Sequence, residues 1–379
     1  VLGTATPSLE SWHNANHKDN KYNLLKLTKR AITEATLPQI ETVLVNDKTK
    51  YGISRLLVDA IATRLKRKEQ SLIFINRRGF APVLYCSNCS WHSECEKCSS
   101  KLVVHSKIKK LKCHHCGFER ELIDKCPSCK SMDLHSLGTG TQKIEEVLKR
   151  FFPEASIFRV DRDSMRTKKS LSLLYERMNN REIDILVGTQ MLAKGHDFPF
   201  LTLVGVLDAD NALYSPDYRS SEKLFSQLLQ VSGRAGRSNI KGEVLIQTSF
   251  PNNPVFEAIK KNSYDLFVEI LLRERKQMGL PPYSFTAILR VESKKLNQGE
   301  QFINEIAKYA KSLKNNVVIF DPLRPTIERV NSYERFQLFF QAKNRNELQN
   351  LLKQLRLVMT KHSLFNKIKW ALDIDPIEF

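Results

Sequence analysis

The chain has 379 residues, of which 41% are hydrophobic, so it is long and apolar enough for two or three domains with their own cores. Its 60 Lys and Arg residues exceed its 41 Asp and Glu residues and leave a net charge of +19. This excess favours a polyanionic partner, although a generally Lys-rich composition would also produce it. No apolar run approaches the ~20 residues that a membrane-spanning helix needs, and no signal peptide is visible. The composition therefore excludes a membrane protein and predicts a soluble, cytoplasmic one.

The first 50 residues hold a turn-rich segment, a short helical stretch and a mixed linker. Because the chain starts at Val1 and runs straight into this turn, we expect it to be a fragment that has lost an N-terminal part. From residue 51 to residue 262, continuous apolar strands alternate with amphipathic helices on both sides of a cysteine-rich block. We expect strands at 71–76, 156–160, 184–188, 201–207 and 242–248, and helices at 54–66, 142–152, 170–179 and 222–232. This alternation is typical of a parallel α/β sheet covered on both faces.

Residues 263–379 have a different pattern. A helix at 265–278 ends before Pro281 and Pro282, and elements in the order β-α-β-β-α-β follow it. This order predicts an α+β C-terminal domain of the ferredoxin-like or S10-like kind. The expected division is a leading segment at 1–50, an α/β lobe at 51–85 and 136–262, a cysteine-rich insertion at 86–135 and a C-terminal domain at 263–379.

All eight cysteines lie between residues 86 and 129, as four C-x-x-C pairs. A C-x-x-C turn directs two sulfurs toward a common point, so four turns supply the ligands of two tetrahedral zinc ions. Without a secretory signal, such pairs indicate metal binding rather than disulfides. Sites of four cysteine sulfurs are closed, so both zinc ions are predicted to be structural.

The four pairs can be grouped into two sites in three ways. Joining the first and second pairs leaves only residues 90–94 between the two turns, whereas joining the second and third leaves room for a β-hairpin. We favour this nested arrangement, and a cross-brace is the main alternative. Site 1 then consists of Cys86, Cys89, Cys126 and Cys129, and site 2 of Cys95, Cys98, Cys113 and Cys116.

Basic and aromatic residues accompany the cysteines and suggest contact with nucleic acid. The aromatic rings of Trp91 and Phe118 could stack on bases. The basic residues of this block are Lys107, Lys109, Lys110, Lys112 and Arg120. A module that only stabilises the fold is the alternative.

The sequence S-G-R-A-G-R ends the helix expected at 222–232 and places two arginines three residues apart. Arg234 and Arg237 can both reach the γ-phosphate of a nucleotide held between two domains, where they would neutralise charge that develops during phosphoryl transfer. We predict catalytic roles for these arginines and for Gln230, which precedes them. A basic helix C-terminus is the alternative explanation.

Small and hydroxyl residues follow the buried strand at 184–188, where open α/β sheets bind ligands. We predict that Gly188, Thr189, Gly195 and Asp197 bind the nucleotide and that Lys194, in the same segment, contacts DNA. Further upstream, Thr139 and Thr141 lead into a helix N-terminus, which can hold a nucleic-acid phosphate. Ordinary turn chemistry would explain any one of these segments alone.

In chain order, these segments resemble the motifs of superfamily 2 helicases. Residues 3–8 (G-T-A-T-P-S) resemble motif III, 74–79 motif IV, 188–198 motif V and 230–237 motif VI. The cysteine spacing, G-L-P-P-Y at 279–283 and D-I-D-P-I-E at 373–378 extend the likeness. Essentially the whole chain resembles the bacterial primosomal protein N′ (PriA) family, the replication restart helicases.

This resemblance implies a RecA-like second helicase lobe with an inserted double zinc-binding module, preceded by the end of the first lobe. It implies a 3′-to-5′ DNA helicase that uses ATP and Mg²⁺, recognises stalled forks and D-loops, and initiates primosome assembly with its protein partners. Thr4 and Thr6 would contact DNA. Arg345 and Gln349 would bind the acidic tail of single-strand DNA-binding protein.

The chain also departs from the family pattern. It has neither G-x-x-x-x-G-K-[ST] nor D-E-x-H, and it lacks the N-terminal DNA-binding domain. We therefore expect the chain alone not to hydrolyse ATP, because no lysine cradles the β- and γ-phosphates. Two functions stay open: part of a helicase, or a non-enzymatic zinc-bearing scaffold that binds DNA forks. A zinc-ribbon transcription factor would leave the helicase-like turns unexplained.

Overall fold

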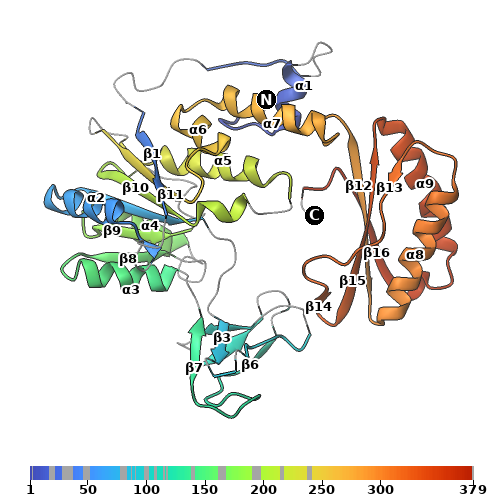
Figure 1. Ribbon diagram of the computed structural model, residues 1–379, viewed down its shortest axis with the longest axis horizontal. Helices are drawn as coiled ribbons and strands as arrows, with labels where there is room; N and C mark the ends of the chain where they lie inside the picture. Colours follow the sequence, from blue (N-terminus) through green and yellow to red (C-terminus); the bar gives the residue numbers. More distant parts are fainter. Residues whose placement is uncertain are drawn as a thin grey trace. The chain divides into compact units, whose positions relative to one another are not determined.

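The computed structural model divides into two compact units (Figure 1). The first unit consists of Val1–Phe80 and Gly138–Leu272, and the second of Ala81–Leu137 and Arg273–Phe379. The residues that the structure describes are 1, 3–16, 22–27, 37–45, 52–76, 83–86, 88–89, 91–97, 102–105, 109–113, 116, 118–137, 141–160, 168–189, 198–213, 217–236 and 241–377.

The first unit is built on a parallel six-stranded sheet in the order β1-β11-β10-β2-β9-β8. Its strands are β1 (Gln39–Leu44), β2 (Gln70–Ile75), β8 (Ile157–Val160), β9 (Ile185–Gly188), β10 (Leu201–Leu207) and β11 (Glu243–Thr248). All residues of β2, β9 and β10 are buried, as expected for central strands covered on both faces. The parallel α/β lobe predicted from the sequence is confirmed.

The edge strand β1 departs from the sequence prediction, which placed a linker there. It pairs with β11 in register from Gln39↔Glu243 to Leu44↔Thr248. Only Ile40 and Val43 of this strand are buried. So weak an apolar pattern is hard to tell from a linker, because the strand gains its stability from a partner about 200 residues away in the sequence.

Helices cover both faces of this sheet. On one face, α2 (Arg55–Lys66) and α3 (Thr141–Phe151) pack their apolar sides against the strands. The other face is covered by α4 (Lys168–Asn179), α5 (Ser220–Ser232), α6 (Pro254–Lys260) and part of α7 (Tyr264–Gln277). The side chain of Ser54 accepts a hydrogen bond from the N–H of Leu57 and so caps α2. A short 3₁₀ helix, η4 (Ala209–Ala212), follows β10.

The start of the chain belongs to the same unit. Helix α1 (Leu9–Asn16) buries Leu9 in the core that α5 and α7 line, and the ring of Trp12 packs edge-on against Tyr264 at 5.4 Å. These contacts attach residues 3–16 to the α/β lobe.

The second unit contains the cysteine-rich module, which leaves the first unit's sheet after β2 and returns before α3. Its strands form an antiparallel sheet in the order β6-β5-β4-β3-β7. They are β3 (Val83–Cys86), β4 (Val103–His105), β5 (Lys110–Lys112), β6 (Glu119–Glu121) and β7 (Leu134–Leu137). The module has its own small apolar core, centred on Leu102 and Leu111, both fully buried.

The rest of the second unit is the C-terminal domain. Its antiparallel sheet has the order β13-β15-β12-β16, and β14 pairs with β15. Its elements are β12 (Phe285–Ser293), α8 (Leu296–Ser312), β13 (Val318–Ile319), β14 (Arg329–Val330), β15 (Tyr333–Ala342), α9 (Arg345–Lys361), η5 (Phe365–Lys367) and β16 (Ile368–Ile374). Leaving β14 aside, this is the split βαβ arrangement of a ferredoxin-like domain, so the predicted α+β fold is confirmed.

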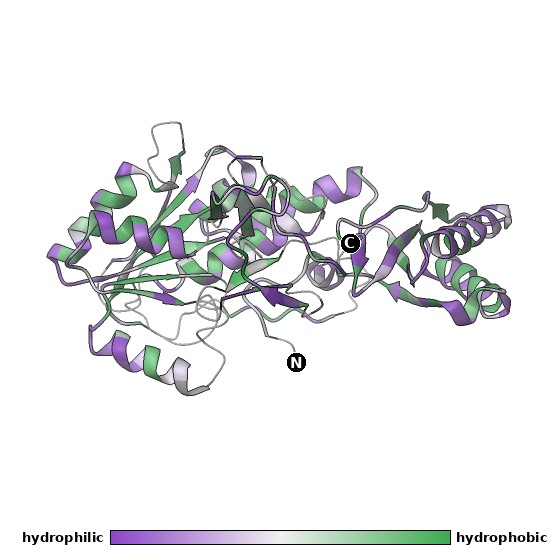
Figure 2. Cartoon of the chain, turned by 90° about the horizontal axis from the view of Figure 1, so that it is seen from below, coloured by the Kyte–Doolittle hydropathy of each residue, from purple (hydrophilic) through white to green (hydrophobic). Residues whose placement is uncertain are grey.

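Alternate residues of the C-terminal sheet explain how its two helices are held. Leu289 of β12 and Leu338 of β15 lie opposite each other and are fully buried against α8 and α9. Along the helices, hydrophobic and hydrophilic residues alternate, as green and purple stretches in Figure 2. Among the described residues, no helix is both long enough and apolar enough to span a bilayer.

Candidate metal centres and nucleotide-binding edge

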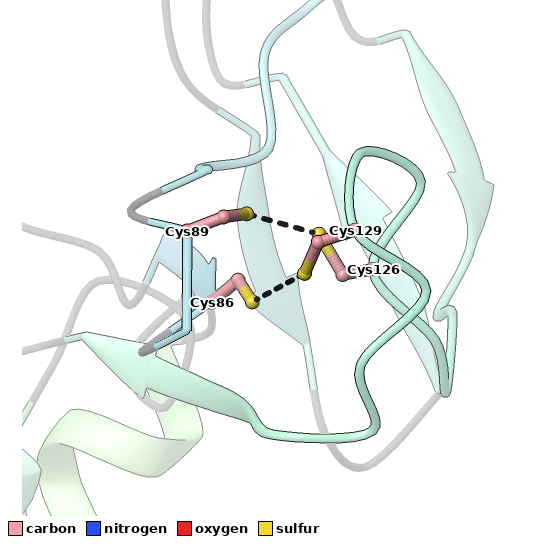
Figure 3. Close-up of side chains that lie close together, drawn as sticks. All are labelled: Cys86, Cys89, Cys126 and Cys129. Carbon is pink, nitrogen blue, oxygen red and sulfur yellow. Dashed lines mark hydrogen bonds between the residues drawn. The ribbon is translucent and has the colours of Figure 1, made fainter.

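The first cysteine cluster joins the two ends of the module. Cys86 is the last residue of β3, Cys89 lies in the turn after it, and Cys126 and Cys129 lie in the turn that precedes β7. The Sγ atoms of Cys86 and Cys129 are 3.6 Å apart, as are those of Cys89 and Cys126 (Figure 3). All four ligand atoms lie within 4.8 Å of one another. The structure thus brings together the four residues grouped as site 1.

Backbone hydrogen bonds shape the two turns of this cluster. The N–H of Cys86 donates to the carbonyl of Trp91 at 2.8 Å, and the N–H of Cys126 donates to that of Ser131 at 2.8 Å. Lys130 has a φ of +63°, which lets the chain reverse directly after Cys129. Main-chain hydrogen bonds therefore hold the two turns that carry the sulfurs of site 1.

The second cluster lies nearer the core of the module. Cys95, Cys113 and Cys116 have Sγ atoms within 4.8 Å of one another, and the Cys95–Cys116 distance is 3.7 Å. The N–H of Cys113 donates to the carbonyl of Phe118 at 2.7 Å. Cys98, the fourth predicted ligand of site 2, falls outside the described residues.

The sulfur geometry fits zinc. A tetrahedron with Zn–S bonds of ~2.3 Å has edges of about 3.8 Å, whereas a disulfide would bring two sulfurs to ~2.05 Å. The sulfur–sulfur distances of 3.6 Å (Cys86–Cys129), 3.6 Å (Cys89–Cys126) and 3.7 Å (Cys95–Cys116) match the edge of the tetrahedron. Donor type and spacing therefore both fit a zinc ion that the protein would hold through cysteine sulfur alone.

The thiols of Cys86 and Cys129 in site 1 have pKa values shifted in opposite directions. Burial raises the pKa of the Cys86 thiol to about 11. A backbone hydrogen bond from Ser131 lowers the pKa of Cys129 to about 6. Binding of a divalent cation would favour the thiolate form of both, because a positive charge stabilises the deprotonated ligand.

The nucleotide-related residues lie on the first unit, at both edges of its sheet. Helix α5 runs back along the parallel strands, so its last turn reaches the edge where the strands begin. There the N–H of Gly236 donates to the carbonyl of Leu201, the first residue of β10, at 3.1 Å. Arg234 is buried, with 6% of the residue's surface exposed, and Gln230 is exposed on the last turn of α5. Gln230 and Arg234 are therefore brought to the amino edge of the sheet.

Gly188 and Thr189 lie at the opposite edge. Gly188 is the last residue of β9, and β9 runs parallel to β10. The structure does not bring these two residues together with Arg234, since the length of a strand separates the two edges.

Thr6, near the chain start, contacts helix α5, and Thr4 bonds to Thr6. The Oγ1 of Thr6 lies 2.9 Å from the Oγ of Ser226, and the Oγ1 of Thr4 accepts a hydrogen bond from the N–H of Thr6 at 3.1 Å. The side chain of Gln230 also reaches Ser226, with a donor–acceptor distance of 3.4 Å. Nothing in the sequence indicates that Ser226 links these two motifs; only the folded arrangement of distant segments reveals it.

The remaining predicted residues divide into two groups. Thr141 is the first residue of α3, at the helix N-terminus, and is half-buried. Thr139, Lys194, Gly195, Asp197 and Arg237 fall outside the described residues.

On the C-terminal domain, Arg345 and Gln349 lie one turn apart on α9. Arg345 donates to Asp375 at 2.6 Å, and its guanidinium lies 4.9 Å from the ring centre of Phe285. The contact with Asp375 is an intramolecular ion pair that the sequence did not reveal, because it joins the start of a helix to the residue after β16.

Three parts of the chain match known protein families. Residues 127–239 match the family described as the helicase conserved C-terminal domain, so the class of the α/β lobe is that of a helicase. Residues 95–120 match the PriA DNA helicase Cys-rich region, and residues 276–377 match the primosomal protein N C-terminal domain.

Curated relatives extend this likeness over the whole chain. The Replication restart protein PriA of Haemophilus influenzae is 36% identical over 99% of this chain and 51% of its own. Those of Rickettsia conorii and Bacillus subtilis are 38% and 33% identical, over 100% and 99% of this chain and 58% and 47% of their own. The chain belongs to the PriA family of replication restart proteins. It spans about half the length of the curated relatives that it matches.

Solved structures resemble this chain only weakly. S. cerevisiae Dbp5 bound to RNA and ADP BeF3 is 14% identical, over 63% of this chain and 45% of its own, with a TM-score of 0.29.

Proposed function

We propose that this chain is part of an ATP-dependent 3′-to-5′ DNA helicase that recognises stalled forks and D-loops and initiates primosome assembly during replication restart. The observation that carries the proposal is the insertion of a module with two cysteine clusters between β2 and α3 of a helicase lobe. The net charge of +19 supports binding of a polyanion.

The nucleotide would bind at the amino edge of the sheet. Gln230 and Arg234 already lie there, and Arg237 follows Gly236 in the sequence. Arginines at this edge would stabilise the charge on a phosphate presented by a second domain. Gly195 and Asp197 stay proposals for the same site.

DNA would be bound at other places on the lobe. We propose that Thr189, at the carboxyl edge of β9, contacts the DNA backbone rather than the nucleotide, because it lies across the sheet from Arg234. Thr4, Thr6, Thr139, Thr141 and Lys194 would contribute further backbone contacts.

Two zinc ions would hold the module, one on each cysteine cluster, with Cys98 as the fourth ligand of the second. Arg345 and Gln349 would receive the acidic tail of single-strand DNA-binding protein, because a guanidinium on an exposed helix face suits a carboxylate. Other primosome proteins would bind elsewhere.

The 379 residues contain no G-x-x-x-x-G-K-[ST], so the chain alone should show no DNA-stimulated ATPase activity. Steady-state ATPase assays with and without forked DNA test this, and turnover by the purified chain would overturn it. When the chain is joined to a lobe that carries this motif, Arg237→Ala should abolish hydrolysis and leave fork binding largely intact.

The second candidate function is a non-enzymatic scaffold that binds forks through the zinc module. The separate core of that module favours it. If the joined protein binds forks but Arg237→Ala leaves its ATPase activity unchanged, the arginine assignment is wrong. If the joined wild-type protein hydrolyses no ATP at all, the scaffold is the better description.

A further inference from the structure

The zinc module carries a groove of about 330 Å³ that neither cysteine cluster uses. It is lined by Trp91, His92, Glu94, Arg120 and Pro127. Its volume is at the lower end of the ~300–1,000 Å³ typical of ligand pockets, so it suits a small planar group rather than a large ligand. Its wall includes an indole and a proline ring beside three polar side chains.

Arg120 is held at this groove by the β-structure of the module. On β6 it alternates with Glu119 and Glu121, so its side chain lies on the other face of the strand, opposite the fully buried Leu111 of β5. Its Nε is buried and, within the described part of the chain, has no hydrogen-bond partner. Its ion pair with Glu96, at 3.9 Å, is long and engages Nη1 instead. The Arg120 side chain as a whole is 29% exposed, so a ligand in the groove that accepts hydrogen bonds can meet its guanidinium.

His92 and Glu94 add groups of the opposite kind. The Nε2 of His92 lies 3.4 Å from a carboxylate oxygen of Glu94, whose side chain is 71% exposed. The groove therefore offers a carboxylate acceptor together with guanidinium and imidazole nitrogens. A bare phosphate would be repelled by Glu94, and a metal cation by Arg120. A planar molecule with both acceptors and a ring N–H on its edge fits this set.

We propose that this groove binds one unpaired nucleobase of a single-stranded DNA segment. The base stacks on Trp91, its carbonyl oxygens accept from Arg120, and its ring N–H donates to Glu94. Thymine and guanine carry this combination of groups. The inference deepens the proposed function, since it rests on DNA binding by this chain.

The other aromatic residue considered from the sequence, Phe118, lies outside the groove. Both Phe118 and Trp91 pack against the apolar core of the module, but the ammonium of Lys97 lies 5.8 Å from the ring centre of Phe118. Trp91 is thus the ring in this module that both lines a groove and accompanies polar groups suited to a base edge.

The test compares two labelled oligonucleotides by fluorescence anisotropy with the zinc-loaded chain: dT12, and an abasic strand of the same length. Wild-type protein should bind dT12 more tightly than the abasic strand. Trp91→Ala should weaken dT12 binding by about tenfold and leave the abasic strand unaffected, whereas Trp91→Phe should retain most of the affinity. Met132→Ala, which removes an exposed apolar side chain of the same module, should change neither.

Glu94→Ala is a second variant that keeps the test valid if the Trp91 variants misfold, because Glu94 is largely exposed and lies outside both cysteine clusters. It should also weaken dT12 selectively, and the zinc content of every variant should equal that of the wild type. The groove assignment would be overturned if wild-type protein bound the two strands equally. It would also be overturned if neither Trp91→Ala nor Glu94→Ala changed dT12 binding; a side chain of a partner protein would then be the better candidate occupant. Failure to bind either strand would instead count against DNA binding by this chain.

Discussion

The backbone N–H of Ser332 donates a hydrogen bond of 2.7 Å to the carbonyl oxygen of Lys97. Lys97 lies inside the C-x-x-C turn that begins at Cys95, whereas Ser332 lies in the turn between β14 and β15 of the C-terminal domain. Asn331 and Ser332 both have positive φ, 50° and 64°, which turns the chain tightly enough to present this N–H. Next to them, Val330 packs against the apolar core of the zinc module. The module and the C-terminal domain therefore share a contact at the second cysteine cluster.

This contact predicts that Val330→Asp separates the two parts of the second unit. An uncompensated carboxylate in the shared core should lower the free energy of unfolding by about 1–3 kcal/mol. Hydrogen exchange should accelerate around residues 95–97 as well as at the β14–β15 turn. Val318→Asp is the matched control, because Val318 is 56% exposed in the same domain, and it should leave exchange in the zinc module unchanged. The coupling is refuted if both variants exchange alike at residues 95–97.

The cysteine clusters predict how zinc is lost in paired variants. The purified chain should contain two zinc ions, measured by elemental analysis. Cys86→Ser combined with Cys126→Ser should remove one, since both sulfurs belong to one cluster. Cys86→Ser combined with Cys113→Ser should remove both, because those sulfurs belong to different clusters.

A cross-brace would reverse this result. It would pair Cys86 with Cys113, so that this second combination would cost only one zinc ion. His92→Ala is the control, and it should keep both ions because His92 pairs with Glu94. Loss of zinc in the control would mean that a histidine takes part in coordination.

Much of the fold could be predicted because most helices and strands have a clear apolar pattern within their own continuous segment of the sequence. The helix expected at 54–66 is Arg55–Lys66 capped by Ser54, and the strand expected at 201–207 has those bounds. Strand β1 could not be predicted in this way, because its short pattern becomes a strand only through β11.

The candidate site shows a different limit. Glycine- and arginine-rich segments could be recognised, but their joint placement depended on topology. A helix that connects parallel strands returns to the edge where they begin, so Arg234 comes to the amino edge and Thr189 stays at the carboxyl edge. Similarly, nothing local links Arg345 to Asp375, which are 30 residues apart.

Gly242 offers a way to disturb the arginine motif without changing an arginine. A Cβ at this position would lie 2.5 Å from the backbone carbon of Ala235 and 2.7 Å from the nitrogen of Gly236. Because these are backbone atoms, no rotamer change relieves the clash. Gly242→Ala should therefore shift the segment around Ala235 and destabilise the chain by about 1–3 kcal/mol in denaturant melts.

Gly233→Ala is the matched control for that variant. Its added Cβ would meet only carbonyl oxygens at 3.4 and 3.6 Å, and its φ of −65° suits alanine. The control should be neutral or stabilising by about 0.4–1 kcal/mol. When the chain is joined to a lobe that binds ATP, Gly242→Ala should reduce ATPase activity. Equal stability of the two variants would show that the Ala235 segment adjusts freely.

The ion pair between Arg345 and Asp375 predicts that an internal carboxylate competes with an acidic partner. Asp375 has a φ of 52°, a conformation that asparagine also tolerates, so Asp375→Asn removes the charge without straining the backbone. The pair is half-exposed, with side chains 54% and 41% accessible, so its contribution is small, at about 0–1 kcal/mol. Asp375→Asn should therefore raise the affinity for an acidic C-terminal peptide of single-strand DNA-binding protein by up to about fivefold in isothermal titration. Arg345→Ala should weaken binding, whereas Lys353→Ala, which removes an exposed charge from the same helix, should change it little. If the peptide binds all three variants and the wild type alike, Arg345 does not receive it.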